Sequence, residues 1–277
     1  MNLLMPRDRT VVVDGLKLHL LDWGGEGREP LLLLHGFAGH AHAWDTLAIA
    51  LQPHFHVLAL DQRGHGESDP APEYGPAATA RDIDGVVAAF GIEQMVVIGL
   101  SMGGRAGMYY AATRPERVSR LVVMDIGPEV SRRASQAPAG PPEPETWESI
   151  EQAARHLYRA NPYPGIHYYR WVVSHSLRQR EDGALVWKWS PTIKSSSAIG
   201  PAIDWWAIVR QIQAPTLVLR GAESPVLDAD VAERMVRELR DGRYREIPRA
   251  VHCLHEDNPE AVQEAIEDFL GVRRALA

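Results

Sequence analysis

The sequence predicts an α/β fold, in which a mostly parallel β-sheet has helices on both faces and a helical segment is inserted after its middle strands. Three observations predict it. Apolar runs of strand length alternate with stretches of helical spacing. A proline-rich and aromatic segment, residues 129–202, interrupts that alternation. The 277 residues, 45% of them hydrophobic and 23% charged, suffice for one large core.

The strands can be predicted in order along the chain. Residues 10–13 and 16–23 flank Asp14 and Gly15, a pair typical of a tight turn between antiparallel strands. Four further runs, residues 30–34, 55–60, 95–99 and 121–124, are apolar enough to be buried strands. The strand pattern resumes after the inserted segment at residues 215–220 and 243–247. We therefore expect eight strands, of which the first two form a hairpin.

Helical spacing fills most of the gaps between these strands. The predicted helices cover residues 43–52, 77–90, 103–113, 229–239 and 259–270. Residues 1–128 and 203–277 are expected to form the core, and residues 129–202 a helical cap. The cap sequence contains a proline-rich stretch at residues 137–145 and many aromatic residues, among them Trp147, Trp171, Trp187 and Trp189.

Charge and cysteine content exclude several classes of protein. The formal net charge is −7 and no run of Lys and Arg could neutralise a row of phosphates, so we expect no nucleic-acid partner. Cys253 is the single cysteine, which excludes an internal disulfide and favours a cytoplasmic location. No segment has the pattern of a signal peptide or of a membrane span, so we expect no membrane association. A small-molecule substrate is expected, with no cofactor and no metal, and the oligomeric state stays open.

Residues 99–104, GLSMGG, follow one predicted strand and precede a predicted helix. This setting is typical of a nucleophile elbow, in which a serine is exposed at a sharp and strained turn. Glycines are needed beside it because a side chain there would strike the adjacent strand or helix. Ser101 is therefore the candidate nucleophile.

A second loop, residues 35–39 (HGFAG), follows the predicted strand 30–34. An acyl-transfer enzyme must hold the developing oxyanion with preorganised N–H donors. We expect the amide of Phe37 to supply one donor. The amide of Met102, at the N-terminus of the helix after the nucleophile, is expected to supply the second.

Two other features are interpreted as structural. His35 is expected to be a hydrogen-bonding residue of its loop rather than a catalyst. Residues 61–69, DQRGHGESD, predict a tight glycine-rich loop held by a buried Arg–Asp network. His65 of that loop is expected to hydrogen-bond within it.

The candidate base is His252. Of the twelve histidines, only His252 and His255 come after the last predicted strand, where a base could reach Ser101 across the carboxyl edge of the sheet. His252 is nearer to that edge. His255 is expected to face away or to pack structurally.

The elbow serine, the upstream HG-x loop and the downstream histidine, in that chain order, resemble the α/β-hydrolase superfamily. The resemblance covers nearly all of the chain outside the predicted cap. It implies a mostly parallel eight-stranded sheet. The GLSMGG and DQRGHGESD segments are similar to those of epoxide hydrolases, dehalogenases and carboxylesterases. Because Ser101 replaces the carboxylate nucleophile of the first two, the resemblance implies hydrolysis of an ester, lactone, thioester or carbon–carbon bond.

The sequence departs from the family pattern at two places. Many relatives have a glycine before the histidine, where this chain has Val251. The family commonly places an Asp three residues after the glycine that ends the next-to-last strand. Here that position is Ser224, so the usual acid is missing or has moved to Glu223.

Three carboxylates are therefore candidates for the catalytic acid. The acid must stand at the end of a strand, between nucleophile and base. Asp125 directly follows the predicted strand 121–124, and its separation from Ser101 resembles that in fluoroacetate and some haloalkane dehalogenases. We expect Asp125 to be the acid, with Glu223 as the alternative. Asp228 is interpreted as the N-cap of the next helix.

These residues favour a serine hydrolase that cleaves a carboxylic ester or lactone through an acyl-enzyme, on small and partly aromatic substrates. The alternative is a carbon–carbon bond hydrolase or an elimination synthase like that of menaquinone biosynthesis. Some of those synthases resemble this elbow, including an arginine after the glycines, as at Arg105. A non-catalytic ligand-binding protein on the same scaffold is a third hypothesis, which a complete triad disfavours.

Overall fold

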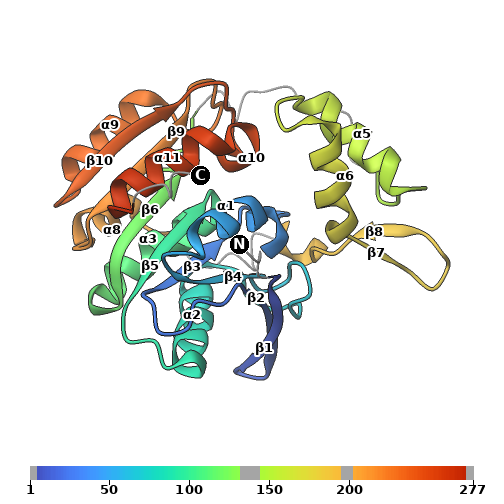
Figure 1. The fold of residues 1–277 in the computed structure, drawn as a ribbon, viewed down its shortest axis with the longest axis horizontal. Helices are drawn as coiled ribbons and strands as arrows, with labels where there is room; N and C mark the ends of the chain where they lie inside the picture. The colour runs from blue at the N-terminus through green and yellow to red at the C-terminus, as the bar shows by residue number, and fades with distance from the viewer. Residues whose placement is uncertain (1–4, 132–143, 195–201, 273–277) are drawn as a thin grey trace.

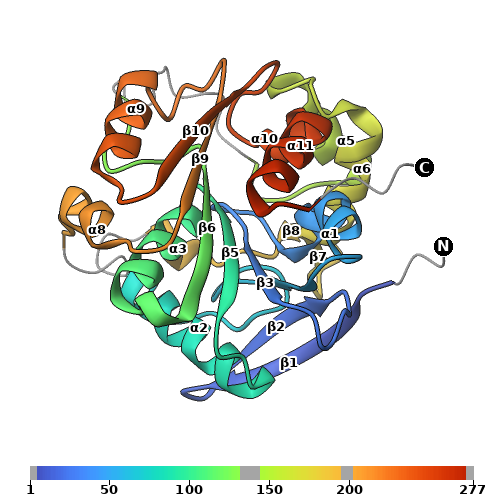
Figure 2. The same cartoon turned by 60° about the vertical axis from the view of Figure 1, so that its left-hand side comes forward.

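The computed structural model describes residues 5–131, 144–194 and 202–272. Within them, one sheet contains eight strands in the order β1-β2-β4-β3-β5-β6-β9-β10 (Figures 1 and 2). Their bounds are β1 Arg7–Val13, β2 Leu16–Asp22, β3 Pro30–Leu34, β4 His56–Leu60, β5 Met95–Leu100, β6 Val118–Met124, β9 Thr216–Gly221 and β10 Gly242–Ile247. Strand β2 is antiparallel to both β1 and β4, and the other neighbours run parallel. The predicted sheet is confirmed.

The first turn has the geometry that its residues predict. Asp14 and Gly15 join β1 to β2 with φ angles of 50° and 84°. Positive φ at both central residues is the conformation that matches the twist of two antiparallel strands, and Asp-Gly adopts it at low cost. Arg7 to Val13 then pair in register with Asp22 to Leu16.

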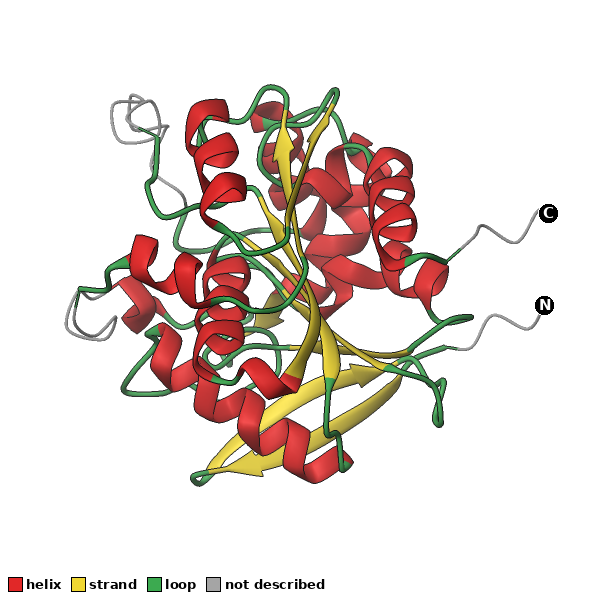
Figure 3. Cartoon of the chain, turned by 90° about the vertical axis from the view of Figure 1, so that its left-hand side faces the viewer, coloured by secondary structure: helices red, strands yellow, loops and turns green. Residues whose placement is uncertain are grey.

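Helices cover both faces of the sheet (Figure 3). One face packs against α2 (Pro76–Phe90), α3 (Met102–Thr113), α8 (Trp205–Gln211) and α9 (Ala229–Glu238). The other packs against the 3₁₀ turn η1 (Ala41–Trp44), α1 (Asp45–Leu51), α10 (Leu254–Asp257) and α11 (Pro259–Leu270). A short 3₁₀ turn, η2 (Pro115–Arg117), precedes β6. The sequence did not predict α8 and α10, which are only seven and four residues long.

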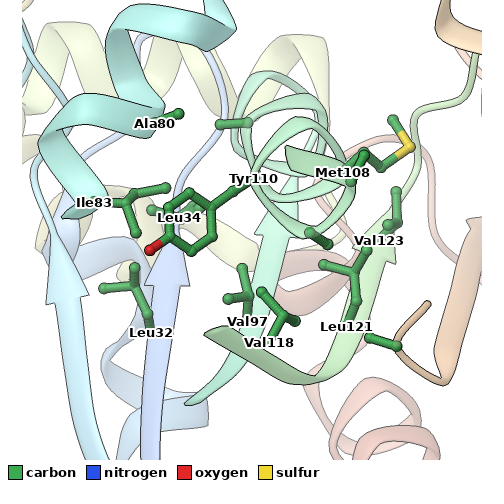
Figure 4. Close-up of a cluster of buried hydrophobic side chains, with 14 of the residues drawn as sticks. Leu32, Leu34, Ala80, Ile83, Val97, Met108, Tyr110, Val118, Leu121 and Val123 are labelled. Carbon is green, nitrogen blue, oxygen red and sulfur yellow. The ribbon is translucent and has the colours of Figure 1, made fainter. Parts of the chain in front are cut away.

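Strand β5 shows how the core is divided. Val97 points to the face that carries α3, whereas Val96 and Ile98 point to the face that carries α11. In Figure 4, Tyr110 of α3 lies among Leu34, Ile83 and Val97. It is fully buried, and its hydroxyl donates to Asp84 at 3.1 Å. A strand buried on both faces explains why the sequence of β5 is continuously apolar.

The inserted segment stands beside the main sheet (Figure 1). It contains α5 (Ile150–Ala160), α6 (Gly165–Ser176), a hairpin of β7 (Leu177–Gln179) and β8 (Leu185–Trp187), and the 3₁₀ turn η3 (Pro191–Lys194). The prediction of helices in this segment is confirmed, but the hairpin was not foreseen. Most of the proline-rich stretch at residues 137–145 lies outside the described residues. No helix in the described ranges is both long and apolar enough to cross a membrane.

Candidate active site

Ser101 occupies the sharp turn between β5 and α3. Its φ and ψ angles are 51° and −113°, a conformation that costs energy for any residue with a side chain. The surrounding hydrogen bonds hold it there: the Ser101 amide donates to Met124 O at 2.9 Å, and Ser101 O accepts from the Arg105 amide at 2.9 Å. The turn has the geometry of a nucleophile elbow.

The elbow depends on the close approach of α3 to the end of β3. A Cβ atom on Gly103 would lie 2.1 Å from Leu34 O, so only glycine fits. The same contact brings the loop after β3 to the nucleophile. A Cβ on Gly36 would lie 3.5 Å from the Ser101 Cβ, which places the neighbouring Phe37 amide on the nucleophile's side of the sheet.

The amides expected to bind an oxyanion are available. Neither the Phe37 nor the Met102 N–H donates a hydrogen bond to any atom of the described residues. The Met102 amide is the first of α3, where the helix dipole adds positive potential. Two free donors near one serine are what a negatively charged oxygen requires.

His252 and Asp125 form a hydrogen-bonded pair. His252 Nδ1 lies 2.7 Å from Asp125 Oδ2, although the two residues are 127 positions apart in the chain. With the carboxylate ionised, Nδ1 carries the proton and Nε2 is left as the basic nitrogen. His252 and Ser101 line the same cavity, and no hydrogen bond joins their side chains in this structure.

Asp125 is fully buried at the end of β6, and its carboxylate accepts three hydrogen bonds. Besides His252, the Gly221 amide donates to Oδ1 at 3.0 Å and the Ser224 hydroxyl donates to Oδ2 at 2.6 Å. The Ser224 hydroxyl itself accepts from the amides of Val226 and Leu227 at 3.0 and 3.2 Å, which directs its own proton to Asp125. This role of Ser224 was not expected from the sequence.

The loop after β10 must cross the end of β9 to bring His252 near Ser101. It can do so because β9 ends in Gly221, where a Cβ would lie 2.2 Å from Val251 O. The Glu223 amide donates to Ala250 O at 3.0 Å, and the Val251 amide donates to Asp257 Oδ2 at 2.8 Å. Val251 itself lines a cavity beside the inserted segment.

The other two acid candidates lie elsewhere. Glu223 is exposed, and both its carboxylate oxygens accept from the Tyr163 hydroxyl of the inserted segment, at 2.7 and 2.8 Å. Asp228 precedes α9 as expected, but its side chain makes no capping hydrogen bond. It accepts instead from the Ser131 hydroxyl at 2.9 Å, because that hydroxyl reaches the carboxylate from the chain after β6. Asp228 is therefore the N-cap residue of α9, as predicted, but its carboxylate does not make the capping hydrogen bond.

The remaining histidines near the site are structural. His255 is buried and stacks on Trp44 with ring centroids 4.1 Å apart, and burial lowers its pKa to about 3. His35 donates from Nδ1 to Gly36 O at 2.7 Å and accepts at Nε2 from the Gln62 amide at 3.0 Å. Both ring nitrogens of His35 are therefore used to hold its loop, and burial lowers its pKa to about 4.

The glycine-rich loop at residues 61–69 holds two carboxylate networks rather than one. Arg63 binds Asp82 of α2 through two hydrogen bonds of 2.6 and 2.7 Å. Asp61 is separate: it accepts from the Ala41 and Glu67 amides and pairs with His19. These hydrogen bonds keep the pKa of Asp61 at about 2, against the cost of its burial. The prediction of a structural Arg–Asp contact is confirmed, with the Asp outside the loop.

Two cavities meet at this site. The larger, about 640 Å³, is lined by Ser101, Met102 and mostly apolar residues between α3, α8 and β6. The smaller, about 350 Å³, lies between the core and the inserted segment. Phe37 and His252 line both cavities, whereas Ser101 lines only the larger.

The tryptophans expected above the site differ in position. Trp187 and Trp189 line the smaller cavity. Trp147 is buried next to Trp187, with ring centroids 5.4 Å apart, and Trp171 is 48% exposed and donates from its indole N–H to Asp45 at 3.2 Å. Glu256, which the sequence did not suggest, also lines the smaller cavity. Its burial raises the pKa of its carboxyl to about 7, and the neighbouring Asp257 adds to this rise.

Comparisons with known proteins agree with this architecture. Residues 29–163 match the profile of the alpha/beta hydrolase fold family. The chain is 30% identical to the 2-(acetamidomethylene)succinate hydrolase of Mesorhizobium japonicum, covering 88% of this chain and 89% of that enzyme. It is 27% identical to an esterase of Mycobacterium tuberculosis, over 91% and 86% of the two chains. A crystal structure of E-2-(acetamidomethylene)succinate hydrolase superposes with a TM-score of 0.85 at 26% identity, covering 96% of this chain and all of the other.

The matches to these whole proteins cover 88–96% of this chain, and they are esterases and other hydrolases. The chain therefore belongs to the α/β-hydrolase family and is a hydrolase.

Proposed function

We propose that this protein is a serine hydrolase that cleaves a carboxylic ester or lactone through an acyl-enzyme, with Ser101, His252 and Asp125 as its triad. The single observation that supports this most is the 2.7 Å contact of His252 Nδ1 with the buried Asp125, beside a serine held in a strained elbow. Residues 129–202 are proposed to act as a cap over the site. The cytoplasmic location stays a prediction.

The proposed mechanism follows from the direction of each hydrogen bond. Asp125 holds the Nδ1–H tautomer of His252, so Nε2 takes the proton of Ser101 as its oxygen attacks the substrate carbonyl. The carbonyl oxygen becomes an oxyanion that accepts from the Phe37 and Met102 amides. His252 then returns the proton to the leaving oxygen, and the acyl group stays on Ser101. A water molecule, deprotonated by His252, releases the acid by the reverse sequence.

The first test is covalent labelling. A fluorophosphonate probe should label the wild-type protein at Ser101, and Ser101→Ala should abolish both labelling and ester turnover. We expect kcat to fall by about 10³-fold or more, with an unchanged circular-dichroism spectrum, because alanine fits the elbow. Esterase activity near the wild-type level in this variant would contradict the proposal.

A panel of substrates separates ester or lactone hydrolysis from the alternative functions. p-Nitrophenyl esters, lactones and a vinylogous 1,5-diketone should be offered side by side to the wild type and to Ser101→Ala. Ester or lactone turnover that needs Ser101 supports the proposal. Turnover of the diketone alone would instead support carbon–carbon bond hydrolysis, and the absence of both labelling and turnover would support a binding protein.

A further inference from the structure

An arginine in the larger cavity carries a charge in mostly apolar surroundings. Arg105 lies one turn of α3 after Ser101 and lines the same cavity, whose other residues are mostly apolar. A guanidinium stays charged in proteins, and burying it is costly unless a partner compensates. Burial accordingly lowers the pKa of Arg105.

Within the described ranges of the chain, no carboxylate neutralises this group. Arg105 Nη2 makes one long hydrogen bond, 3.4 Å to Gly127 O, and Nε is buried without a hydrogen-bond partner. The guanidinium carbon lies 5.0 Å from the centre of the Trp205 ring. Stacking on a ring supports the face of a guanidinium and leaves its N–H edges available to an anion.

Other arginines of the core show the contrast. Arg63 pairs with Asp82, and Arg220 pairs with Glu246 at 2.6 Å. Arg120 pairs with Glu29. In each case the charge at the edge of the core is matched by a carboxylate of the chain itself. Arg105 differs from them in facing the catalytic cavity, where a ligand can supply the missing anion.

The two cavities indicate which part of a substrate would meet Arg105. In an acyl-enzyme the acyl group is bonded to Ser101, which lines only the larger cavity. The leaving group takes its proton from His252, which lines both. The acyl group therefore fits the larger cavity with Arg105, and the leaving group fits the smaller cavity.

We propose that the acyl part of the substrate carries a carboxylate and that Arg105 binds it, so that this hydrolase selects half-esters of dicarboxylic acids. The proposal rests on the proposed function of the same site. A carboxylate would accept hydrogen bonds from the unpaired N–H groups of Arg105. Charge-assisted hydrogen bonds of this kind contribute about 10- to 100-fold in affinity. The apolar wall of the cavity would contact the methylene chain between the carboxylate and the ester.

The experiment compares matched pairs of substrates. p-Nitrophenyl monoesters of glutaric, adipic and suberic acid are each compared with the methyl ester of the same compound, which has the same acyl chain without charge. In the wild type, kcat/KM should be at least about 10-fold higher for the acid than for the methyl ester of at least one chain length. In Arg105→Gln this ratio should fall to about 1 or below, and Arg105→Lys should recover part of it.

The matched control is Arg234→Gln. Arg234 also stacks on a tryptophan, 3.8 Å from the ring centre of Trp206, but it pairs with Glu129 and does not line the cavity. Its removal should leave the acid-to-methyl-ester ratio unchanged. Turnover of the neutral esters reports whether each variant is folded. Free glutarate should also inhibit the wild type competitively, and more strongly than glutaramide, which tests the proposal without any variant.

Two results would overturn this assignment while leaving the esterase proposal intact. One is efficient turnover of neutral esters with no preference for the acids at any chain length. The other is a preference that depends on Arg105 but concerns an anionic leaving group, measured with 4-acetoxybenzoate against its methyl ester. Failure of the wild type to label or to hydrolyse any ester would instead contradict the proposed function itself.

Discussion

The ends of β6 and β9 lie next to each other in the sheet, yet the carboxylates that follow them differ in burial and in hydrogen-bond partners. Asp125 at the end of β6 is fully buried and accepts from His252, Ser224 and the Gly221 amide. Glu223, two residues after β9, is exposed and bonded to Tyr163 of the inserted segment. Three donors from the core hold the Asp125 carboxylate in one orientation, whereas the Glu223 carboxylate contacts a separate element, the inserted segment. The core therefore offers the better support for a catalytic histidine.

The largest expected effect comes from exchanging the two carboxylates for amides. Asp125→Asn should reduce kcat by about 10²- to 10⁴-fold, because an amide misorients the imidazole and can favour the wrong tautomer. Glu223→Gln should change kcat by less than about threefold, since its side chain contacts Tyr163 rather than His252. Both variants are measured on one good ester after circular dichroism shows that they are folded. The reverse ranking would move the acid to Glu223.

Ser224→Ala tests whether the hydroxyl that donates to Asp125 supports the position of this carboxylate. The variant removes one hydrogen bond to Asp125 and leaves the Val226 and Leu227 amides without their acceptor. We expect a loss of about 1–3 kcal/mol in the free energy of unfolding, measured by urea denaturation, and a fall in kcat of about 3- to 10-fold. Ser119→Ala, which removes a hydroxyl bonded to Glu29 far from the site, is the control. Equal effects of the two changes would mean that Ser224 does not position Asp125.

The pH dependence of stability tests the burial of Glu256, a carboxylate that faces the inserted segment. Its pKa is raised by burial from 4.5 to about 7, so the folded protein keeps a proton there that the unfolded chain loses. The contribution of Glu256 to stability should therefore fall as pH rises from about 4.5 to 7, by up to about 3 kcal/mol. Buried histidines such as His255 contribute in the opposite sense, so the effect is measured as the difference between the wild type and Glu256→Gln. Glu256→Gln has no charge to bury, so its advantage in Tm should be largest at pH 8 and vanish near pH 4.

The exposed Glu223 supplies the control for this measurement. Glu223→Gln should show no gain in Tm that grows between pH 4 and pH 8, because its carboxylate remains in solvent. If Glu256→Gln and Glu223→Gln gave the same pH profile, burial of Glu256 could not be the cause.

The smallest effect is expected from the contact that distinguishes Glu223. Tyr163→Phe removes the hydroxyl that donates to this carboxylate at the surface. An exposed hydrogen bond of this kind contributes little, so Tm and kcat/KM should stay close to wild type, within about twofold for kcat/KM. A larger loss, seen with bulky but not with small esters, would show that the contact holds the inserted segment over the site.

Much of the core could be predicted because its signals are local. The central strands were predicted from apolar runs such as residues 30–34, and Asp14-Gly15 predicted the turn between the first two. The hairpin β7–β8 was missed because its strands have three residues each and half-buried side chains. The short helices α8 and α10 were missed for a similar reason: one or two turns give too few repeats for a helical period to be recognised.

The sequence by itself determined the α/β architecture and the choice of Ser101 and His252 as candidates, because a strand, a turn and a helix in direct succession leave a local pattern. It also proposed Asp125 and left Glu223 open. Only the tertiary structure placed Asp125 against His252, Ser224 against Asp125, and Arg105 in a cavity where no described lining residue is a carboxylate. Such contacts join residues up to 127 positions apart, and strand order and the path of the loop after β10, rather than spacing along the chain, decide which side chains meet.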